Sequence, residues 1–174
     1  LTLKVSGTAT LISVLVGIPL GALIAQGRFS GRKFLLSLTY AWMGLPPVVV
    51  GLWVSLFLWR NGPLGYLGLM YTPTAMIIAQ FIIAAPIITA ISAAAFQQVD
   101  EGLKLQVKAL GATWWQTLFL LVREVRLPLL VAVIAGFGRV IAEVGAAMMV
   151  GGNVLDRTRV LTTAMVLEVN KCSY

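Results

Sequence analysis

Long apolar runs alternate with short polar segments along this chain, and the longest runs have the length of membrane spans. A membrane-spanning helix needs about 20 predominantly apolar residues. Pro46 and Pro47 fall inside the second run, and because proline removes a backbone donor, we expect that helix to kink or break there. The predicted spans are residues 8–25, 34–59, 75–96 and 127–150, with the start of a fifth at 161–169.

One polar segment, residues 97–126, carries too many charges to lie in hydrocarbon. Within it Leu103, Val107 and Leu110 recur at i, i+4 and i+7, which predicts a short helix with one apolar face. Gly111 is expected to end that helix before a second one begins at residues 112–115. A helix–glycine–helix module between spans is typical of a docking element, so we expect a soluble partner to bind here.

A second interpretation of the same segment is an amphipathic helix that lies on acidic lipids. Lys104 and Lys108 would suit that role, and Trp114 and Trp115 would then anchor the segment at the interface. The narrow apolar face and the glycine that divides the segment favour docking.

Composition places the chain among membrane proteins. It has 174 residues, of which 59% are hydrophobic and 11% charged, whereas an average soluble protein is about 25% charged. The absence of histidine excludes histidine metal sites and Ser-His-Asp triads from this chain. Cys172 is the single cysteine, so the chain forms no internal disulfide. The net charge of +7 comes from basic residues at the ends of apolar runs, a distribution that indicates membrane topology and not nucleic-acid binding.

The positions of these basic residues predict which side of the membrane is cytoplasmic. Cytoplasmic loops carry an excess of Lys and Arg near the span ends, which places residues 97–126 in the cytoplasm. This topology places Lys4 outside, so we expect another span before Leu1, and the run at residues 161–169 is too short for a whole span, so we expect a piece of a longer protein. The basic residues on the cytoplasmic side are Arg28, Arg32, Lys33, Lys104, Lys108, Arg123 and Arg126, against Lys4, Arg60, Arg157 and Arg159 opposite.

Two ionisable residues, Arg139 and Glu143, fall within the fourth predicted span. In a continuous helix they would be one turn apart and project to the same face. Each is costly alone in lipid, so such residues usually face a bundle interior or an aqueous path. One interpretation is an ion pair that holds neighbouring helices in register. The other is a polar route in which Arg139 attracts an anion and Glu143 orients it.

The glycines around this pair are the other candidates for a transport path. Gly145 offers a smooth patch where another helix can approach closely. Gly151, Gly152 and Asn153 end the span with residues that tolerate left-handed backbone. Turn formation explains these three residues, and exposed amides that help to gate an anion near the outer mouth are the alternative.

The order of these motifs resembles the permease subunits of ABC importers for oxyanions, and it is most similar to tungstate-type permeases, with molybdate and sulfate permeases as relatives. The resemblance rests on ALGA in the polar loop, then a proline, then F-x-R-x-x-x-E-x-G-A, and finally GGN. It extends over nearly the whole chain. The loop motif of that family begins Glu-Ala-Ala, whereas this chain has Leu105-Gln106-Val107, a departure that leaves the register of the ATPase contact open but not the docking module itself.

The resemblance implies an all-α membrane protein, a single permease domain over residues 1–174 in a multi-span bundle, with a cytoplasmic coupling-helix loop at 97–126. It implies a homodimer in the prokaryotic inner membrane, with cytoplasmic ABC ATPase subunits that bind ATP and Mg and an external oxyanion-binding protein. The permease itself would carry no cofactor and do no covalent chemistry. The implied coupling residues are Leu103, Val107, Lys108, Leu110, Gly111 and Ala112, and the implied path residues are Arg139, Glu143, Gly145, Gly151, Gly152 and Asn153.

We therefore expect an ATP-driven importer of a tetrahedral oxyanion, with tungstate first and molybdate next. The main alternative is a secondary anion transporter driven by an ion gradient, which would need titratable groups along its path. A structural membrane subunit without a path is a further alternative. A membrane enzyme is disfavoured because the chain lacks histidine and clustered carboxylates.

Overall fold

The protein is an elongated bundle of helices in a computed structural model, which describes residues 1–27 and 30–172, apart from the side chain of Lys108. Among these described residues, two helices are long and apolar enough to cross a membrane, and up to four spans result if each of two bent helix pairs counts as one. The helical elements, in chain order, are α1 (Thr2–Gln26), α2 (Arg32–Met43), α3 (Pro47–Leu58), a short 3-10 turn η1 (Gly65–Leu67), α4 (Pro73–Gln97), α5 (Glu101–Ala109), α6 (Trp114–Glu124), α7 (Arg126–Ile141), α8 (Gly145–Gly151) and α9 (Leu161–Lys171).

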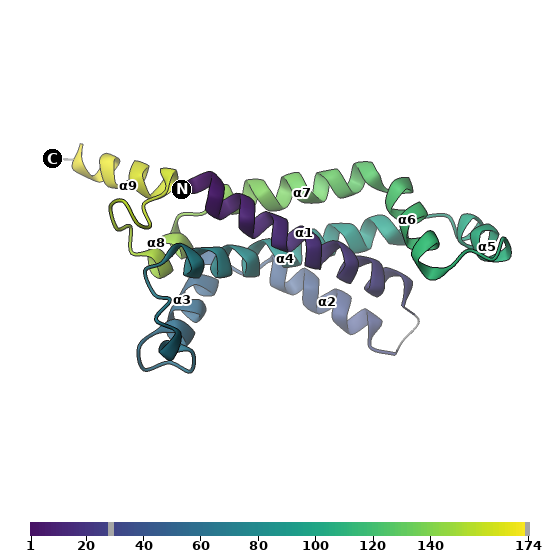
Figure 1. Cartoon of the computed structure of the whole chain (residues 1–174), viewed down its shortest axis with the longest axis horizontal. Coiled ribbons are helices and arrows are strands. Elements are labelled where there is room, and N and C mark those ends of the chain that lie inside the picture. The colour runs from purple at the N-terminus through teal and green to yellow at the C-terminus, as the bar shows by residue number, and fades with distance from the viewer. Residues whose placement is uncertain (28–29, 173–174) are drawn as a thin grey trace.

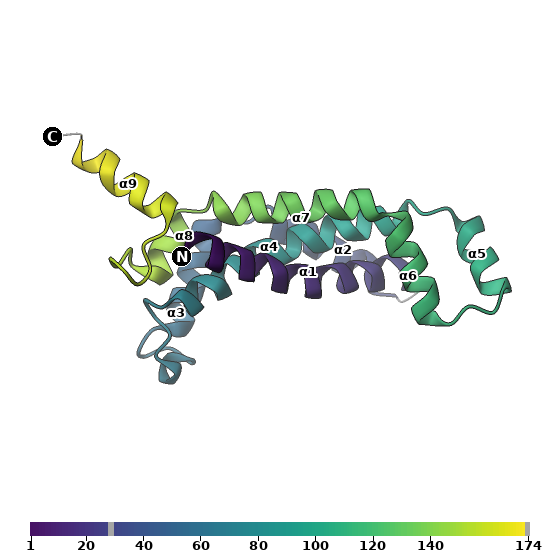
Figure 2. The ribbon, with the colours of Figure 1, turned by 45° about the horizontal axis from the view of Figure 1, so that its top comes forward.

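Helices α1, α4 and α7 lie side by side along the long axis and form the body of the bundle (Figures 1 and 2). Small residues permit the close contact of α1 with α4. A Cβ atom built on Gly21 would lie 2.8 Å from Ser92 Cβ and 2.9 Å from the backbone nitrogen of Ala93. Gly17 likewise faces Ile88 and Thr89. The glycines of the first span thus let the backbones approach, as small residues do between membrane helices.

The second predicted span is broken where its prolines lie. Helix α2 ends at Met43 and α3 begins at Pro47, and the two axes differ by 98°. Pro47 occupies the first position of α3, where its missing donor costs nothing, and Pro46 precedes it in extended conformation. The prediction of a break at these prolines is confirmed.

The fourth predicted span is also broken, and here the prediction of one continuous helix is wrong. Helix α7 ends at Ile141, α8 begins at Gly145, and the pair is bent by 58°. Residues 142–144 belong to neither helix and separate the two pieces. The fifth predicted run forms α9, whose 11 residues are shorter than a span.

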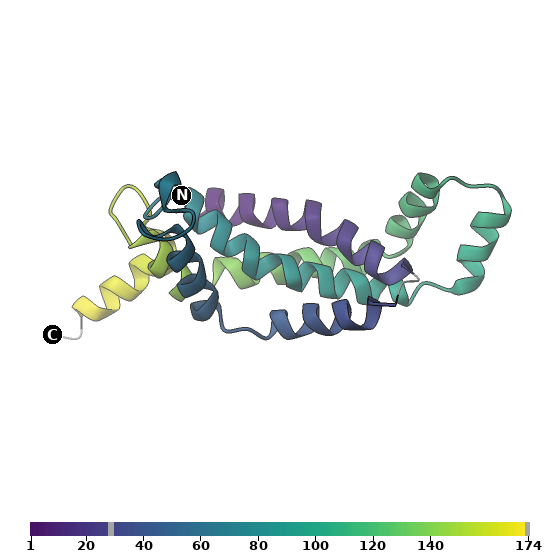
Figure 3. The same ribbon diagram turned by 90° about the horizontal axis from the view of Figure 1, so that it is seen from below.

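Two hydrophobic clusters stabilise the two ends of the bundle. One gathers α3, the start of α4, the last turn of α7 and α8. The other gathers the ends of α1 and α4 with α6 and the start of α7. Helices α5 and α6 form a hairpin at this end of the molecule, while α8 and α9 lie at the opposite end (Figure 3). The two groups of candidate residues are therefore at opposite ends.

Candidate functional site

The break between α7 and α8 contains the buried carboxylate of Glu143. Glu143 is 7% exposed, and its Oε1 accepts a hydrogen bond of 2.9 Å from the backbone N–H of Ala146. The carbonyl oxygen of Glu143 accepts a second bond, 3.2 Å long, from Thr162 Oγ1. Glu143 therefore satisfies a free amide in the first turn of α8 and ties the break to the start of α9.

Arg139 does not share a face with Glu143, so this part of the prediction is wrong. Arg139 lies exposed in the last turn of α7, and the helix ends before Glu143, which removes the i, i+4 geometry. No salt bridge joins these two described side chains. The structural ion pair is thus not formed, and an exposed arginine on a membrane helix remains.

The glycines of this region lie where neighbouring segments approach closely. A Cβ on Gly145 would meet Val48 at 2.6 Å, and one on Gly151 would meet Met76 Sδ at 2.9 Å. Gly152 has φ +69° and Asn153 φ +50°, so the predicted left-handed turn is confirmed. The alternative role of this turn as an anion gate stays a prediction.

Threonines complete the turn, and their importance was not predicted. Thr158 is 0% exposed, and its hydroxyl donates to the Gly151 carbonyl at 2.5 Å and accepts from Val154 N–H at 2.9 Å. Asn153 Nδ2 donates to the Thr163 carbonyl at 3.4 Å. Because buried polar groups cost free energy unless they are paired, this network holds the segment after α8 in one arrangement.

Gln80 was also missed, although it is the one polar residue with an amide side chain in the third predicted span. It is 2% exposed, and its Nε2 donates to the carbonyl oxygen of Val140 at 3.3 Å. The same carbonyl accepts from the backbone N–H of Glu143 at 3.2 Å. Gln80 thus links α4 to the break. A lone amide in an apolar run is the signal that would have indicated it.

The α5–α6 hairpin follows the predicted helix–glycine–helix order. Gly111 has φ +74°, and the N–H of Ala112 donates to the Val107 carbonyl at 3.3 Å, which closes the end of α5. Thr113 then begins α6 with a capping box, in which Thr113 N–H donates to Gln116 Oε1 at 2.8 Å and Gln116 N–H donates to Thr113 Oγ1 at 3.4 Å. Local sequence alone accounts for this turn.

The predicted apolar face of α5 is only partly correct. Leu103 packs against the cluster at the ends of α1 and α4, and Val107 is half-buried. Leu110 lies past the end of α5 and is 85% exposed, so it does not continue that face. The backbone of Lys108 belongs to α5, but its side chain is outside the described residues. What the hairpin exposes instead is Leu105, Leu110, Trp115 and Phe119.

A comparison with known protein families decides the identity of this bundle. The family described as binding-protein-dependent transport system inner membrane component matches residues 17–167. The chain belongs to this family. It is an ABC transporter permease, a multi-pass inner-membrane component without a cofactor of its own, and ATP is bound by a separate ATPase subunit. Transport by this family also requires a substrate-binding protein on the outer side.

Individual relatives of this permease agree with the family. It is 40% identical over 167 residues to the tungstate uptake system permease protein TupB of Peptoclostridium acidaminophilum. The aligned region covers 96% of this chain and 73% of that protein. It is 39% identical to a probable anion ABC transporter permease protein of Haloferax volcanii, over 98% of this chain and 75% of the relative. The molybdenum transport system permease protein ModB of Escherichia coli is 29% identical over 95% of this chain and 76% of its own length.

Proposed function

We propose that this permease moves a tetrahedral oxyanion into the cytoplasm, with tungstate as the first candidate and molybdate as the second. The observation that carries the proposal is the 40% identity to a tungstate permease over 96% of this chain. Relatives named for anion and molybdenum transport match with comparable coverage, which supports the same class of substrate. Family membership favours ATP-driven import over the gradient-driven alternative.

The path for the anion is proposed to run between two copies of the chain, along α7 and α8. Arg139 supports this arrangement, because a charged side chain exposed to lipid is costly and therefore usually faces protein or water. A second copy would cover Arg139 and enclose a path. Glu143, buried at the break, would set the orientation of α8. The residues without bulky side chains beside the path would let neighbouring segments pack closely there; they are Gly145, Gly151, Gly152 and Asn153.

The α5–α6 hairpin, within residues 97–126, is proposed to be the cytoplasmic docking site of the ATPase. Its exposed Leu105, Leu110, Trp115 and Phe119 form an apolar surface that this chain leaves uncovered, and such surfaces mark interaction sites. The coupling residues Leu103, Val107, Lys108, Gly111 and Ala112 lie in or beside this hairpin. Helix α6 continues into α7 at Val125, so movement of the hairpin would reach the α7–α8 break as a rigid-body rotation.

The test is uptake by the assembled importer in proteoliposomes that also contain its ATPase and binding protein. We expect ATP-dependent accumulation of tungstate, weaker accumulation of molybdate when the binding protein retains both, and none without the binding protein. Calorimetry on the binding protein identifies the retained anion independently. Uptake that needs only an imposed ion gradient, or a binding protein that retains no oxyanion, would contradict the proposal.

A further inference from the structure

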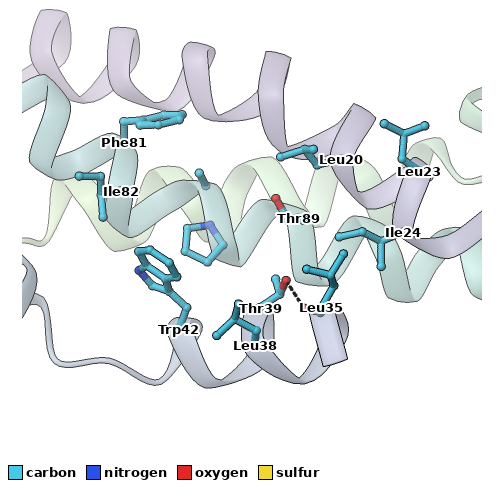
Figure 4. A pocket seen from close by; sticks show the side chains of 12 residues that line it. Leu20, Leu23, Ile24, Leu35, Leu38, Thr39, Trp42, Phe81, Ile82 and Thr89 are labelled. Carbon is cyan, nitrogen blue, oxygen red and sulfur yellow. Dashed lines mark hydrogen bonds between the residues drawn. The ribbon is translucent and has the colours of Figure 1, made fainter. Parts of the chain in front are cut away.

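A groove with apolar walls runs between α1, α2 and α4 (Figure 4). It has a volume of about 530 Å³. Leu23 and Ile24 line it from α1, Leu35 and Trp42 from α2, and Phe81 from α4. Its polar groups are two threonine hydroxyls and the indole N–H of Trp42, and Thr39 already donates to the Leu35 carbonyl at 2.8 Å. The groove therefore offers little to a polar ligand and much to a hydrocarbon chain.

A second hollow, of about 560 Å³, lies where the bundle meets the α5–α6 hairpin. Gln26 at the end of α1, Arg32 at the start of α2 and Gln97 at the end of α4 line it from the bundle. Lys104 from α5 and Trp114 from α6 line it from the hairpin. This hollow is polar and basic, unlike the groove.

The two hollows adjoin along α1 and α2, two of the helices that line both. On α1, Leu23 and Ile24 of the groove are followed directly by Ala25 and Gln26 of the polar hollow. On α2, Arg32 precedes Leu35 by three residues, which is one helical turn. Together they make one site with a polar mouth and an apolar body, the division of polarity that a phospholipid has.

The mouth holds a positive charge that no described acidic side chain neutralises. Lys104 is paired with Glu101 at 2.9 Å, and Glu101 is the acidic residue that lines the hollow. Arg32 has its Nε buried without a hydrogen-bond partner, and among the described residues no salt bridge reaches its guanidinium. A buried donor without a partner is costly, so an anion here would be stabilised.

We propose that this site binds an anionic phospholipid, with its phosphate at Arg32 and an acyl chain in the groove between α1, α2 and α4. The lipid comes from the leaflet on the side of the α5–α6 hairpin. Its headgroup lies between α2 and α5. Because α5 packs mainly against α6, a headgroup in this position adds a contact between the hairpin and the bundle. The bound lipid therefore braces the hairpin against the bundle, and the orientation of the hairpin depends on the lipid composition.

The first experiment measures phosphatidylglycerol that copurifies with the assembled importer from bilayers of phosphatidylcholine and phosphatidylglycerol. Arg32→Gln is expected to weaken retention about fivefold, the effect of one basic residue near an anionic headgroup. Lys33→Gln is the matched control, because Lys33 is the next residue, carries the same charge, is exposed and does not line the hollow. Equal losses in both variants, or no loss in Arg32→Gln, would overturn the proposal.

The second experiment keeps Arg32 intact and probes the groove through Trp42. Phosphatidylglycerol with brominated acyl chains is added at a low mole fraction in phosphatidylcholine. It is expected to quench tryptophan fluorescence more than brominated phosphatidylcholine does at the same fraction. Trp42→Phe should remove that excess. No excess, or an excess that persists in Trp42→Phe, refutes acyl binding in the groove. Inorganic phosphate forms the other arm: if it displaces the lipid at millimolar concentration, the mouth is a site for a free anion and the lipid proposal is wrong.

Discussion

The two ends of this permease differ in where their polar and apolar side chains find contacts. Around the α7–α8 break, Glu143, Thr158 and Thr163 are buried and hydrogen-bonded within the chain. At the α5–α6 hairpin, large apolar side chains stay exposed and the hydrogen bonds are local to the turn. The first end has its arrangement fixed by internal contacts, whereas the second leaves its contact surface for another molecule.

This difference predicts where substitutions will act. At the hairpin, changes should alter assembly and transport while the bundle keeps its stability. At the break, changes that remove a hydrogen-bonding group should reduce the stability of the permease, because buried polar groups would lose partners inside the chain. Four substitutions, two of them with a matched control, test the contrast.

Gly111→Asp is expected to have the largest effect. A Cβ at Gly111 meets nothing within 4 Å, and aspartate is one of the few residues that adopt left-handed backbone, so the main change is a carboxylate added to the proposed ATPase interface. An unpaired charge at an interface costs about 2–5 kcal/mol, so ATPase affinity should fall roughly thirtyfold or more. Pull-down of the ATPase and ATP-dependent uptake measure the loss.

Gly111→Asn is the matched control for that substitution. Gly111 has φ +74°, and asparagine tolerates left-handed backbone while carrying no charge. The neutral variant should retain most of the ATPase affinity, and both variants should unfold at the wild-type temperature. Normal ATPase binding by Gly111→Asp would remove the docking assignment.

Thr158→Val tests the opposite end. The change keeps the shape but removes the hydroxyl that donates to the Gly151 carbonyl and accepts from Val154 N–H. Leaving these groups without a partner should lower the free energy of unfolding by about 1–3 kcal/mol. Thermal unfolding of the purified permease in detergent measures it.

Thr8→Val provides the comparison for Thr158→Val, since the Thr8 hydroxyl is exposed and donates only to the Lys4 carbonyl one turn earlier. It should shift stability by less than about 0.5 kcal/mol. Similar losses in both variants would mean that the turn after α8 is no more constrained than an exposed helix face.

Glu143→Gln separates the charge of Glu143 from its hydrogen bond. The glutamine oxygen can still accept from Ala146 N–H, so the thermal stability should stay near that of the wild type. If the negative charge helps to position the path, uptake should fall about tenfold, the loss of one charge-assisted contact of roughly 1.5 kcal/mol. Unchanged uptake would assign Glu143 to packing alone.

Thr113→Ala should have the smallest effect. It removes the capping box at the start of α6 and should cost about 1 kcal/mol of local helix stability. Because the α5–α6 hairpin lies outside the body of the bundle, we expect faster amide hydrogen exchange in the first turn of α6 and no change in the global unfolding temperature. A global shift would show that the hairpin unfolds together with the bundle.

The sequence predicted those features that depend on nearby residues. Pro46 and Pro47 removed donors at known positions, and the second span is broken there. Gly111 was expected to end one helix before another begins, and the turn lies there, built from the left-handed backbone of Gly111 and the Thr113 cap of α6. The break after Ile141 was not predicted, because no proline marks it.

That break depends on groups that are distant in the sequence. Gln80 binds the Val140 carbonyl across 60 positions of chain, and Thr162 binds the Glu143 carbonyl across 19. The sequence by itself therefore determined a helical membrane permease, the approximate positions of its spans and its polar hairpin, because span length, proline and glycine act locally. Only the tertiary structure decided that Arg139 is exposed while Glu143 is buried, because the contacts between helices fix where α7 ends and which side chains can meet.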